Sequence, residues 1–181
     1  FNIKYISARS KKKRRAINYK NNQWISDYNK IINKNDVDVI VELIGGSDGP
    51  AKKLVFGALK NKKHVVTANK AVLAAHGNEL MSGRGQQLLR FEAAVAGAIP
   101  IIQGMSGGLA ANRLASLFGI INGTCNYIFG EMESNGTAFD EVLAEAQRLG
   151  YAEAEPSFDI DGIDAAHKLT ILLALGFTGT F

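Results

Sequence analysis

An acidic stretch in the last part of the chain, residues 151–168, ends at a lysine, Lys168. Asp161, Asp164 and Lys168 are spaced three and four residues apart, so a helix would carry them on one face. Such a set is most often a surface ion pair worth about 0.3–0.5 kcal/mol. The loop before this helix adds three more carboxylates: Glu153, Glu155 and Asp159. Because like charges this close are tolerated best where a cation binds, the alternative is an anionic pocket for a cationic substrate group, with Lys168 in its wall.

A second lysine stands at the start of another predicted helix. Lys70 follows a short predicted strand, residues 64–66. In open α/β sheets, ligands bind beyond the carboxyl ends of the strands. A lysine there can donate a proton to a bound carbonyl group or stabilise the negative charge that develops on its oxygen. Because most lysines are solvated surface residues, Lys70 alone is weak evidence for a site.

A basic run, residues 11–15, follows the first predicted strand, residues 3–7. In dinucleotide-binding folds the second strand ends beside the adenosine ribose, where an acid binds the 2′-OH of NAD and arginine or small polar residues accept the 2′-phosphate of NADP. If the first strand of this chain is the second strand of such a fold, Ser7, Arg9 and Ser10 favour NADP, since no acid lies beside them. The alternative is a solvated basic loop.

The first part of the chain alternates between strand and helix, as an open parallel sheet requires. The predicted elements are strands over 3–7, 37–44 and 64–66 and helices over 26–33 and 50–59. The strand over 37–44 is apolar and rich in β-branched residues, which predicts that both of its faces are covered. The ligand edge of this sheet is expected to have three turns: 7–15, 45–49 and 67–70.

The pattern changes after residue 73. The predicted elements are a helix over 73–87, strands over 88–93 and 113–121, and helices over 127–134, 138–149 and 161–176. Two glycines within residues 82–85 interrupt the first of these helices. Thr137 is the expected cap of the helix over 138–149, and Gly150 is expected to close it. A shift in composition near residue 90 predicts a domain crossover there.

The composition excludes several classes of protein. Of the 181 residues, 46% are hydrophobic and 21% charged, as in ordinary globular proteins. No apolar run approaches the roughly 20 residues that span a bilayer, so no membrane association is expected. The net charge of +4 comes from the local basic run, and without an RNA-binding or zinc signature we expect no nucleic-acid partner. The single cysteine, Cys125, excludes a disulfide within the chain and favours a reducing compartment, hence a cytoplasmic protein.

Several segments together resemble homoserine dehydrogenase, over nearly the whole chain. They are VDVIVELIGG (37–46), HVVTANK (64–70), FEAAVAG (91–97) with IPII (99–102), NGTCNY (122–127), and GYAEAEP (150–156) running on to DGIDAAHK (161–168). The resemblance implies NAD(P)-dependent interconversion of L-aspartate 4-semialdehyde and L-homoserine, a step toward threonine and methionine. The alternatives are another amino-acid dehydrogenase of the same fold and a binding module without catalysis.

The resemblance also implies site residues. Lys168 and Lys70 are the candidate catalytic lysines at the reacting oxygen. The residues implied for the substrate are Gly123, Thr124, Tyr151, Glu153, Asp159 and Asp164. Those expected to hold NADP or NAD are Arg9, Ser10, Lys11, Gly45, Gly46, Thr67 and Lys70. The family's loop for a monovalent cation such as Na⁺ is matched by Glu92, Val95, Gly97 and Ile99, where the sequence without the resemblance favours a plain tight turn.

We therefore predict an α/β protein in two parts. Residues 1–89 are expected to form an incomplete NAD(P)-binding Rossmann domain, and residues 90–181 the start of an α/β substrate and dimerisation domain. Because family members dimerise through the second part, we expect a homodimer or a higher homo-oligomer. Both ends are expected to be cut inside structure. The glycine fingerprint G-x-G-x-x-G is missing, and it would belong upstream of Phe1.

Overall fold

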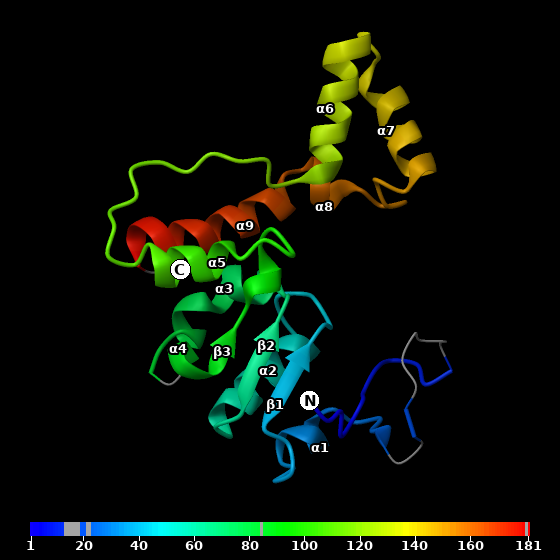
Figure 1. Ribbon diagram of the computed structural model, residues 1–181. Helices are drawn as coiled ribbons and strands as arrows, with labels where there is room; N and C mark the ends of the chain where they lie inside the picture. Colours follow the sequence, from blue (N-terminus) through cyan, green and yellow to red (C-terminus); the bar gives the residue numbers. More distant parts are fainter. Residues whose placement is uncertain (13–18, 21–22, 84, 180) are drawn as a thin grey trace. The chain divides into compact units, whose positions relative to one another are not determined.

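The computed structural model describes residues 1–12, 19–20, 23–83, 85–179 and 181 (Figure 1). The chain divides into two compact units, Phe1–Ala94 and Val95–Phe181, and each is described by itself. Three residues of the basic run, Lys13, Arg14 and Arg15, lie outside the described residues.

The first unit is built on a sheet of three parallel strands in the order β1 (Val39–Glu42), β2 (His64–Thr67) and β3 (Leu89–Arg90). Helix α2 (Pro50–Lys60) connects β1 to β2, and α3 (Lys70–Leu80) with α4 (Gly85–Leu88) connects β2 to β3 (Figure 1). Proline at the first position of α2 suits a helix start, because the N–H it lacks would have had no partner there. Parallel strands joined through helices confirm the predicted α/β fold.

Only one face of the sheet is covered by the described residues. Burial alternates along β1 and β2, so that Ile40 and Val65 are buried while Val39, Val41 and Val66 are exposed. Helix α2 packs on β1 and β2 and supplies the apolar side chains of this core. The prediction that both faces of the strand over 37–44 are covered is therefore wrong for this structure, because one helical layer shields only every second side chain.

The predicted strand over 3–7 is also wrong. The Ile6 N–H donates to the Gln23 carbonyl (2.7 Å) and the Ile6 carbonyl accepts from the Ile25 N–H (2.9 Å), which makes an isolated bridge between Ile6 and Trp24. A strand requires such hydrogen bonds at successive residues. The helix predicted after it is shorter than expected, α1 (Asn29–Ile32).

The helix predicted over 73–87 begins earlier and breaks where expected. Asn69 accepts a hydrogen bond from the Val72 N–H (3.2 Å), so α3 starts at Lys70. It ends at Leu80, and the left-handed Gly83 (φ 55°) separates it from α4. The single turn η2 (Glu92–Ala94) closes the unit.

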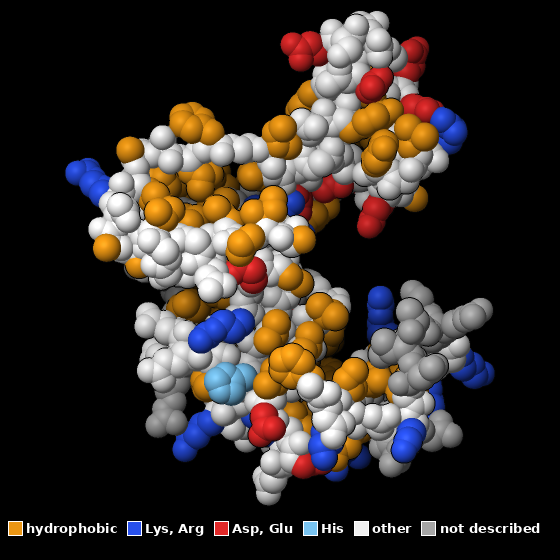
Figure 2. Space-filling view, in the orientation of Figure 1, with side chains coloured by type: hydrophobic (Ala, Val, Ile, Leu, Met, Phe, Trp, Pro, Cys, Tyr) orange, Lys and Arg blue, Asp and Glu red, His pale blue; other side chains and the backbone are white. Residues whose placement is uncertain are grey.

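All the regular elements that the structure describes in the second unit are helices. They are α5 (Ile101–Gln103), the π-helical turn η3 (Gly104–Gly108), α6 (Gly123–Asn135), α7 (Phe139–Leu149), α8 (Ser157–Ile160), α9 (Ile163–Leu173) and the π-helical turn η4 (Ala174–Thr178). Helices α6 and α7 lie side by side (Figure 1) around a small core of Ile128, Val142, Ala146 and Ala152. Acidic side chains gather over the outer surface of this pair (Figure 2).

Two predictions for the second unit are wrong and one is confirmed. Residues 113–121 are not a strand but part of the long connection between η3 and α6 (Figure 1), because no described segment pairs with their backbone. Thr137 does not cap α7, because the cap position is Ala138, which makes no side-chain hydrogen bond. Asp140 and Glu141 in the first turn instead stabilise the helix start, since their negative charges lie at the positive end of the helix dipole. Gly150 closes α7 in the left-handed conformation, as predicted.

Candidate functional site

Lys168 and Asp164 form a largely buried ion pair on α9. The Lys168 Nζ donates to Asp164 Oδ2 (2.6 Å) and to the Ile121 carbonyl (2.6 Å). The side chains of Lys168 and Asp164 are only 20% and 7% exposed. The predicted shared helix face is confirmed for Asp164 and Lys168 but not for Asp161, which precedes α9, and the alternative of a surface ion pair is contradicted. A buried pair of this kind needs further hydrogen bonds to offset the loss of hydration.

Asn122 supplies some of those hydrogen bonds. Its Nδ2 donates to Asp159 Oδ1 (2.8 Å) and to Asp164 Oδ2 (2.9 Å). Its Oδ1 accepts from the Cys125 N–H (2.8 Å), which caps α6. Asn122 was not predicted from the sequence as a member of the site. Its position directly before a helix was a signal for the cap, but nothing local indicated the two carboxylates.

Thr124 joins the same cluster from the first turn of α6. Its buried hydroxyl lies 2.8 Å from the Tyr151 carbonyl and 3.1 Å from Asp159 Oδ2, and its one hydrogen can serve only one of these acceptors at a time. The ring of Tyr151 is exposed, with its centroid 4.8 Å from that of Tyr127. Gly123, the first residue of α6, has open space where a Cβ would lie. The connection before α6, its first turn and α8–α9 thus meet at one place.

Cys125 lies beside the carboxylates and is held as a thiol. Its Sγ donates to the Asp159 carbonyl (3.3 Å). Burial raises the pKa of this thiol, and the negative charges of Asp159 and Asp164 raise it further. Because the thiolate is the nucleophilic form, this environment disfavours a nucleophilic role for Cys125.

Three of the predicted carboxylates are exposed and stay outside the cluster: Glu153, Glu155 and Asp161. Glu153 is exposed, and among the described residues its hydrogen bond is through the backbone carbonyl, which accepts from Gln147 Nε2 (3.0 Å). Asp161 is an exposed residue at the end of α8. The cluster formed by Asn122, Thr124, Asp159, Asp164 and Lys168 is called the carboxylate–lysine cluster below.

In the first unit, Glu42 ties together the carboxyl ends of two strands. This last residue of β1 is fully buried (0% exposed). Its Oε1 accepts from the backbone N–H groups of Ile44 (2.6 Å) and Gly45 (3.1 Å), and its Oε2 accepts from the Thr67 hydroxyl (2.5 Å) at the end of β2. A buried carboxylate is retained where donors of this kind compensate its charge.

The network continues from Thr67 to the start of α3. The Thr67 hydroxyl oxygen accepts from the Asn69 N–H (3.0 Å), and Asn69 Nδ2 donates to the Gly46 carbonyl (2.9 Å). These bonds join the turn at Gly45 and Gly46 to the first residue of α3, the predicted catalytic Lys70. Both glycines have positive φ, 85° and 82°. Glu42 and Asn69 were not singled out from the sequence, although both lie within the matched motifs.

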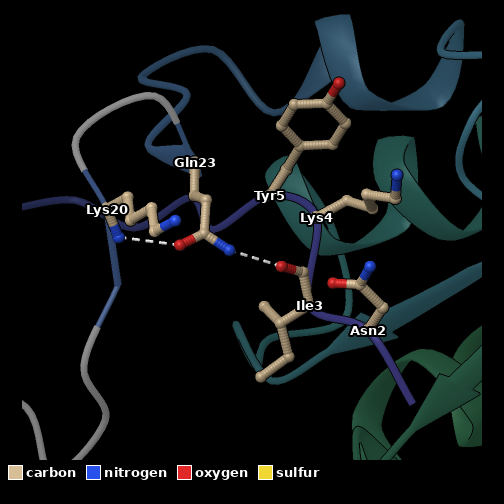
Figure 3. Close-up of a pocket in the computed structure, with 6 residues that line it drawn as sticks. All are labelled: Asn2, Ile3, Lys4, Tyr5, Lys20 and Gln23. Atoms are coloured by element: carbon tan, nitrogen blue, oxygen red, sulfur yellow. Dashed lines mark hydrogen bonds between the residues drawn. The ribbon is translucent and has the colours of Figure 1, made fainter.

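The predicted adenosine-side residues do not join this network. Arg9, Ser10 and Lys11 are exposed, and the Lys11 carbonyl accepts from the Tyr19 hydroxyl (3.3 Å). A hollow of about 450 Å³ lies near them in the chain, lined by Asn2, Ile3, Lys4, Tyr5, Lys20 and Gln23. Figure 3 shows Gln23 accepting from the Lys20 N–H (2.7 Å) and donating to the Ile3 carbonyl (2.5 Å) across it. Because this hollow contains none of the predicted site residues, no function is assigned to it.

The predicted cation loop has an unusual backbone. Ala96 and Ala98 adopt positive φ, 48° and 70°, and the Ile99 N–H donates to the Ala96 carbonyl (2.9 Å). Glu92 belongs to the first unit and Val95, Gly97 and Ile99 to the second. The described residues contain no group of three or more His, Cys, Asp or Glu that could hold a metal ion, but a loop with one carboxylate and backbone carbonyls would not form such a group. The cation site stays a prediction.

Comparisons with known proteins cover nearly the whole chain. The family model of the NAD-binding domain of homoserine dehydrogenase matches residues 1–88, and that of homoserine dehydrogenase itself matches residues 100–181. The chain is 54% identical to the homoserine dehydrogenase of Neisseria gonorrhoeae over 156 residues, which are 85% of this chain and 36% of that protein. The chain thus spans little more than a third of that relative. Among the described residues, no helix has both the length and the apolar character to cross a membrane.

Solved structures agree with these matches. The crystal structure of a homoserine dehydrogenase from Thiobacillus denitrificans superposes with a TM-score of 0.81 at 53% identity, over 87% of this chain and 37% of that one. A hyperthermophilic archaeal homoserine dehydrogenase in complex with NADPH superposes with a TM-score of 0.69 at 27% identity, over 85% of this chain and 48% of that one.

Proposed function

The chain belongs to the homoserine dehydrogenase family, and from this membership we propose that the protein interconverts L-aspartate 4-semialdehyde and L-homoserine with a nicotinamide cofactor. This step leads toward threonine and methionine. The observation that carries the proposal is the carboxylate–lysine cluster, in which a largely buried lysine ammonium pairs with Asp164, and Asn122 joins Asp164 to a second carboxylate, Asp159. That arrangement suits a substrate that has an ammonium group at one end and an aldehyde or alcohol oxygen at the other.

Lys168 is the proton donor of the proposed reaction. A bound nicotinamide would supply the hydride to the aldehyde carbon, or accept it in the reverse direction. Reduction of an aldehyde leaves an alkoxide that needs a proton. The Lys168 ammonium has three N–H donors, of which two are directed at Asp164 and the Ile121 carbonyl, so the third is available to the reacting oxygen. Lys70, at the start of α3 in the first unit, is the second proposed catalytic lysine.

The carboxylates bind the amino group of the substrate in this proposal. Each carboxylate has about four lone-pair positions. Asp159 uses one oxygen for Asn122 and the other for Thr124, which leaves acceptor capacity for an ammonium group. Asp164 orients Lys168. The proposed substrate site is completed by Gly123, Tyr151 and Glu153.

The cofactor residues are proposed on the ligand edge of the sheet. A glycine turn with positive φ lets a backbone approach a ligand closely, and Gly45 and Gly46 have this conformation. A Cβ at Gly45 would meet open space, and one at Gly46 would meet only the Asp48 carbonyl oxygen, at 3.9 Å. Thr67 and Lys70 follow on the neighbouring strand end. Arg9, Ser10 and Lys11 favour NADP over NAD. A relative solved with NADPH supports this preference.

Several finer predictions stay proposals. They are the monovalent cation held by Glu92, Val95, Gly97 and Ile99, the division into domains over 1–89 and 90–181, the homodimer or higher homo-oligomer, and the cytoplasmic location. The cation proposal has a direct consequence: turnover by the full-length protein should depend on Na⁺ or K⁺ at fixed ionic strength, and Glu92→Gln should remove that dependence.

The central test is turnover by the full-length protein. We expect NADPH oxidation with L-aspartate 4-semialdehyde and a loss of kcat of at least about 100-fold in Lys168→Ala, the usual contribution of a positioned proton donor. The control is Lys53→Ala, an exposed lysine of α2 that should keep full activity. An inactive wild type would refute the proposed reaction and favour another amino-acid dehydrogenase or a binding module. Full activity of a folded Lys168→Ala variant would refute the role of Lys168.

A further inference from the structure

We infer that Asn122 is a positioning residue, whose side-chain amide holds Asp159 and Asp164 in one arrangement and, through Asp164, fixes the ammonium group of Lys168. Both hydrogens of the amide are used for this, at 2.8 Å and 2.9 Å from the two carboxylates. The inference rests on the proposed function, because its consequence is tighter handling of the substrate at the carboxylate–lysine cluster.

The orientation of the amide is determined by the helix that it caps. Asn122 has an extended backbone (φ −133°, ψ 120°) before α6, and its Oδ1 accepts from the Cys125 N–H (2.8 Å). The opposite orientation would place Oδ1 against two carboxylates and Nδ2 against a backbone N–H, so that three contacts would become repulsive. The helix start therefore directs both amide hydrogens at the carboxylates.

The carboxylates need this donor because they repel each other. Asp159 comes from α8 and Asp164 from α9, and both accept from the same nitrogen, so their charges lie close together. Among the described contacts, Lys168 pairs directly with Asp164 but not with Asp159. The amide is thus the neutral group that joins the second carboxylate to the ion pair. Without it, Asp159 and Asp164 would separate, and Asp164 would be held less firmly beside Lys168.

Two substitutions separate this role from capping. Asp and Ser cap helices about as well as Asn. Asn122→Ser keeps the capping acceptor and removes both amide donors, whereas Asn122→Asp keeps the acceptor and places a third carboxylate beside the other two. If Asn122 only caps α6, both variants should resemble the wild type. If it positions the carboxylates, both should be impaired and Asp should be the worse, although it is nearly isosteric with Asn.

The experiment measures kinetics and thermal unfolding of the full-length protein at neutral pH. We expect kcat/KM for L-aspartate 4-semialdehyde to fall about 10-fold or more in Asn122→Ser and further in Asn122→Asp, the range for a lost hydrogen bond to a charged group. The KM for NADPH should not change. The control, Asn126→Asp, adds the same charge at an exposed position one turn later in α6 and should behave as the wild type.

Unfolding midpoints without ligand decide the inference independently of turnover. Asn122→Asp should unfold at a lower temperature than Asn122→Ser. An equal or higher midpoint for Asn122→Asp would overturn the inference, as would unchanged kcat/KM in an active enzyme. If the wild type fails to reduce aspartate semialdehyde, the proposed function falls, and the order of the two midpoints still supports or overturns the role of Asn122.

Discussion

Removing the carboxylate of Glu42 should destabilise the protein more than any exposed substitution in the same unit. Glu42 is fully buried and accepts three hydrogen bonds, from the N–H groups of Ile44 and Gly45 and from the Thr67 hydroxyl. These bonds hold the glycine turn at the ligand edge against the end of β2. Glu42→Ala removes all of them at once.

The expected loss in the free energy of unfolding depends on how buried each of the three hydrogen-bond donors is. Thr67 is fully buried, and an unsatisfied buried hydroxyl costs about 1–3 kcal/mol. Ile44 and Gly45 are exposed enough for water to reach their N–H groups, so each of those bonds is worth about 0.5–1.5 kcal/mol net. Glu42→Ala should therefore lower the free energy of unfolding by about 2–6 kcal/mol. Glu42→Gln keeps a carbonyl acceptor for the two N–H groups but faces Thr67 with an NH₂ group, so it should lose about 1–3 kcal/mol.

Equilibrium unfolding of the full-length protein in urea, followed by circular dichroism, would measure these differences. Amide hydrogen exchange should also speed up at Ile44 and Gly45 in Glu42→Ala, and much less in Glu42→Gln, which keeps an acceptor for these N–H groups. The matched control is Glu79→Ala, an exposed glutamate of α3, which should stay within about 0.5 kcal/mol of the wild type. The reasoning would be refuted if Glu42→Ala fell within the same margin as this control.

Two further predictions concern the second unit. The pKa of Cys125 is raised by burial and then by Asp159 and Asp164, so its proton is held more tightly in the folded protein than in the unfolded one. The rate of alkylation by iodoacetamide should therefore reach its midpoint at a higher pH in the folded protein than in urea. Mass spectrometry of the Cys125 peptide would measure this rate, and an equal or lower midpoint would contradict the prediction. Gly150→Ala and Gly130→Ala should shift the unfolding temperature in opposite directions. Gly150 is left-handed (φ 81°), so alanine there should cost about 1–2 kcal/mol of stability, whereas Gly130 lies inside α6 with open space for a Cβ, so alanine there should add about 0.5–1 kcal/mol. Temperature shifts of the same sign would contradict this prediction.

Local chemistry determined much of what could be predicted from the sequence. The first turn of α2 at Pro50, the left-handed end of α7 at Gly150 and the break after α3 each depend on one residue and its near neighbours. The four-residue spacing of Asp164 and Lys168 likewise predicted a shared helix face, because helical geometry alone decides that. The resemblance to a family placed these residues in a site.

Only the tertiary structure decided what those residues face. The spacing of Asp164 and Lys168 in the sequence is compatible with either a surface ion pair or a buried one. Their burial depends on the Ile121 carbonyl, which lies 47 residues before Lys168 and accepts its second hydrogen bond. Asn122 reaches carboxylates 37 and 42 residues away, and Glu42 reaches a hydroxyl 25 residues away, so neither role has a local signal. The predicted strands over 3–7 and 113–121 failed for the same reason. Alternation of side chains favours an extended backbone, but a strand forms only where a partner strand accepts its hydrogen bonds.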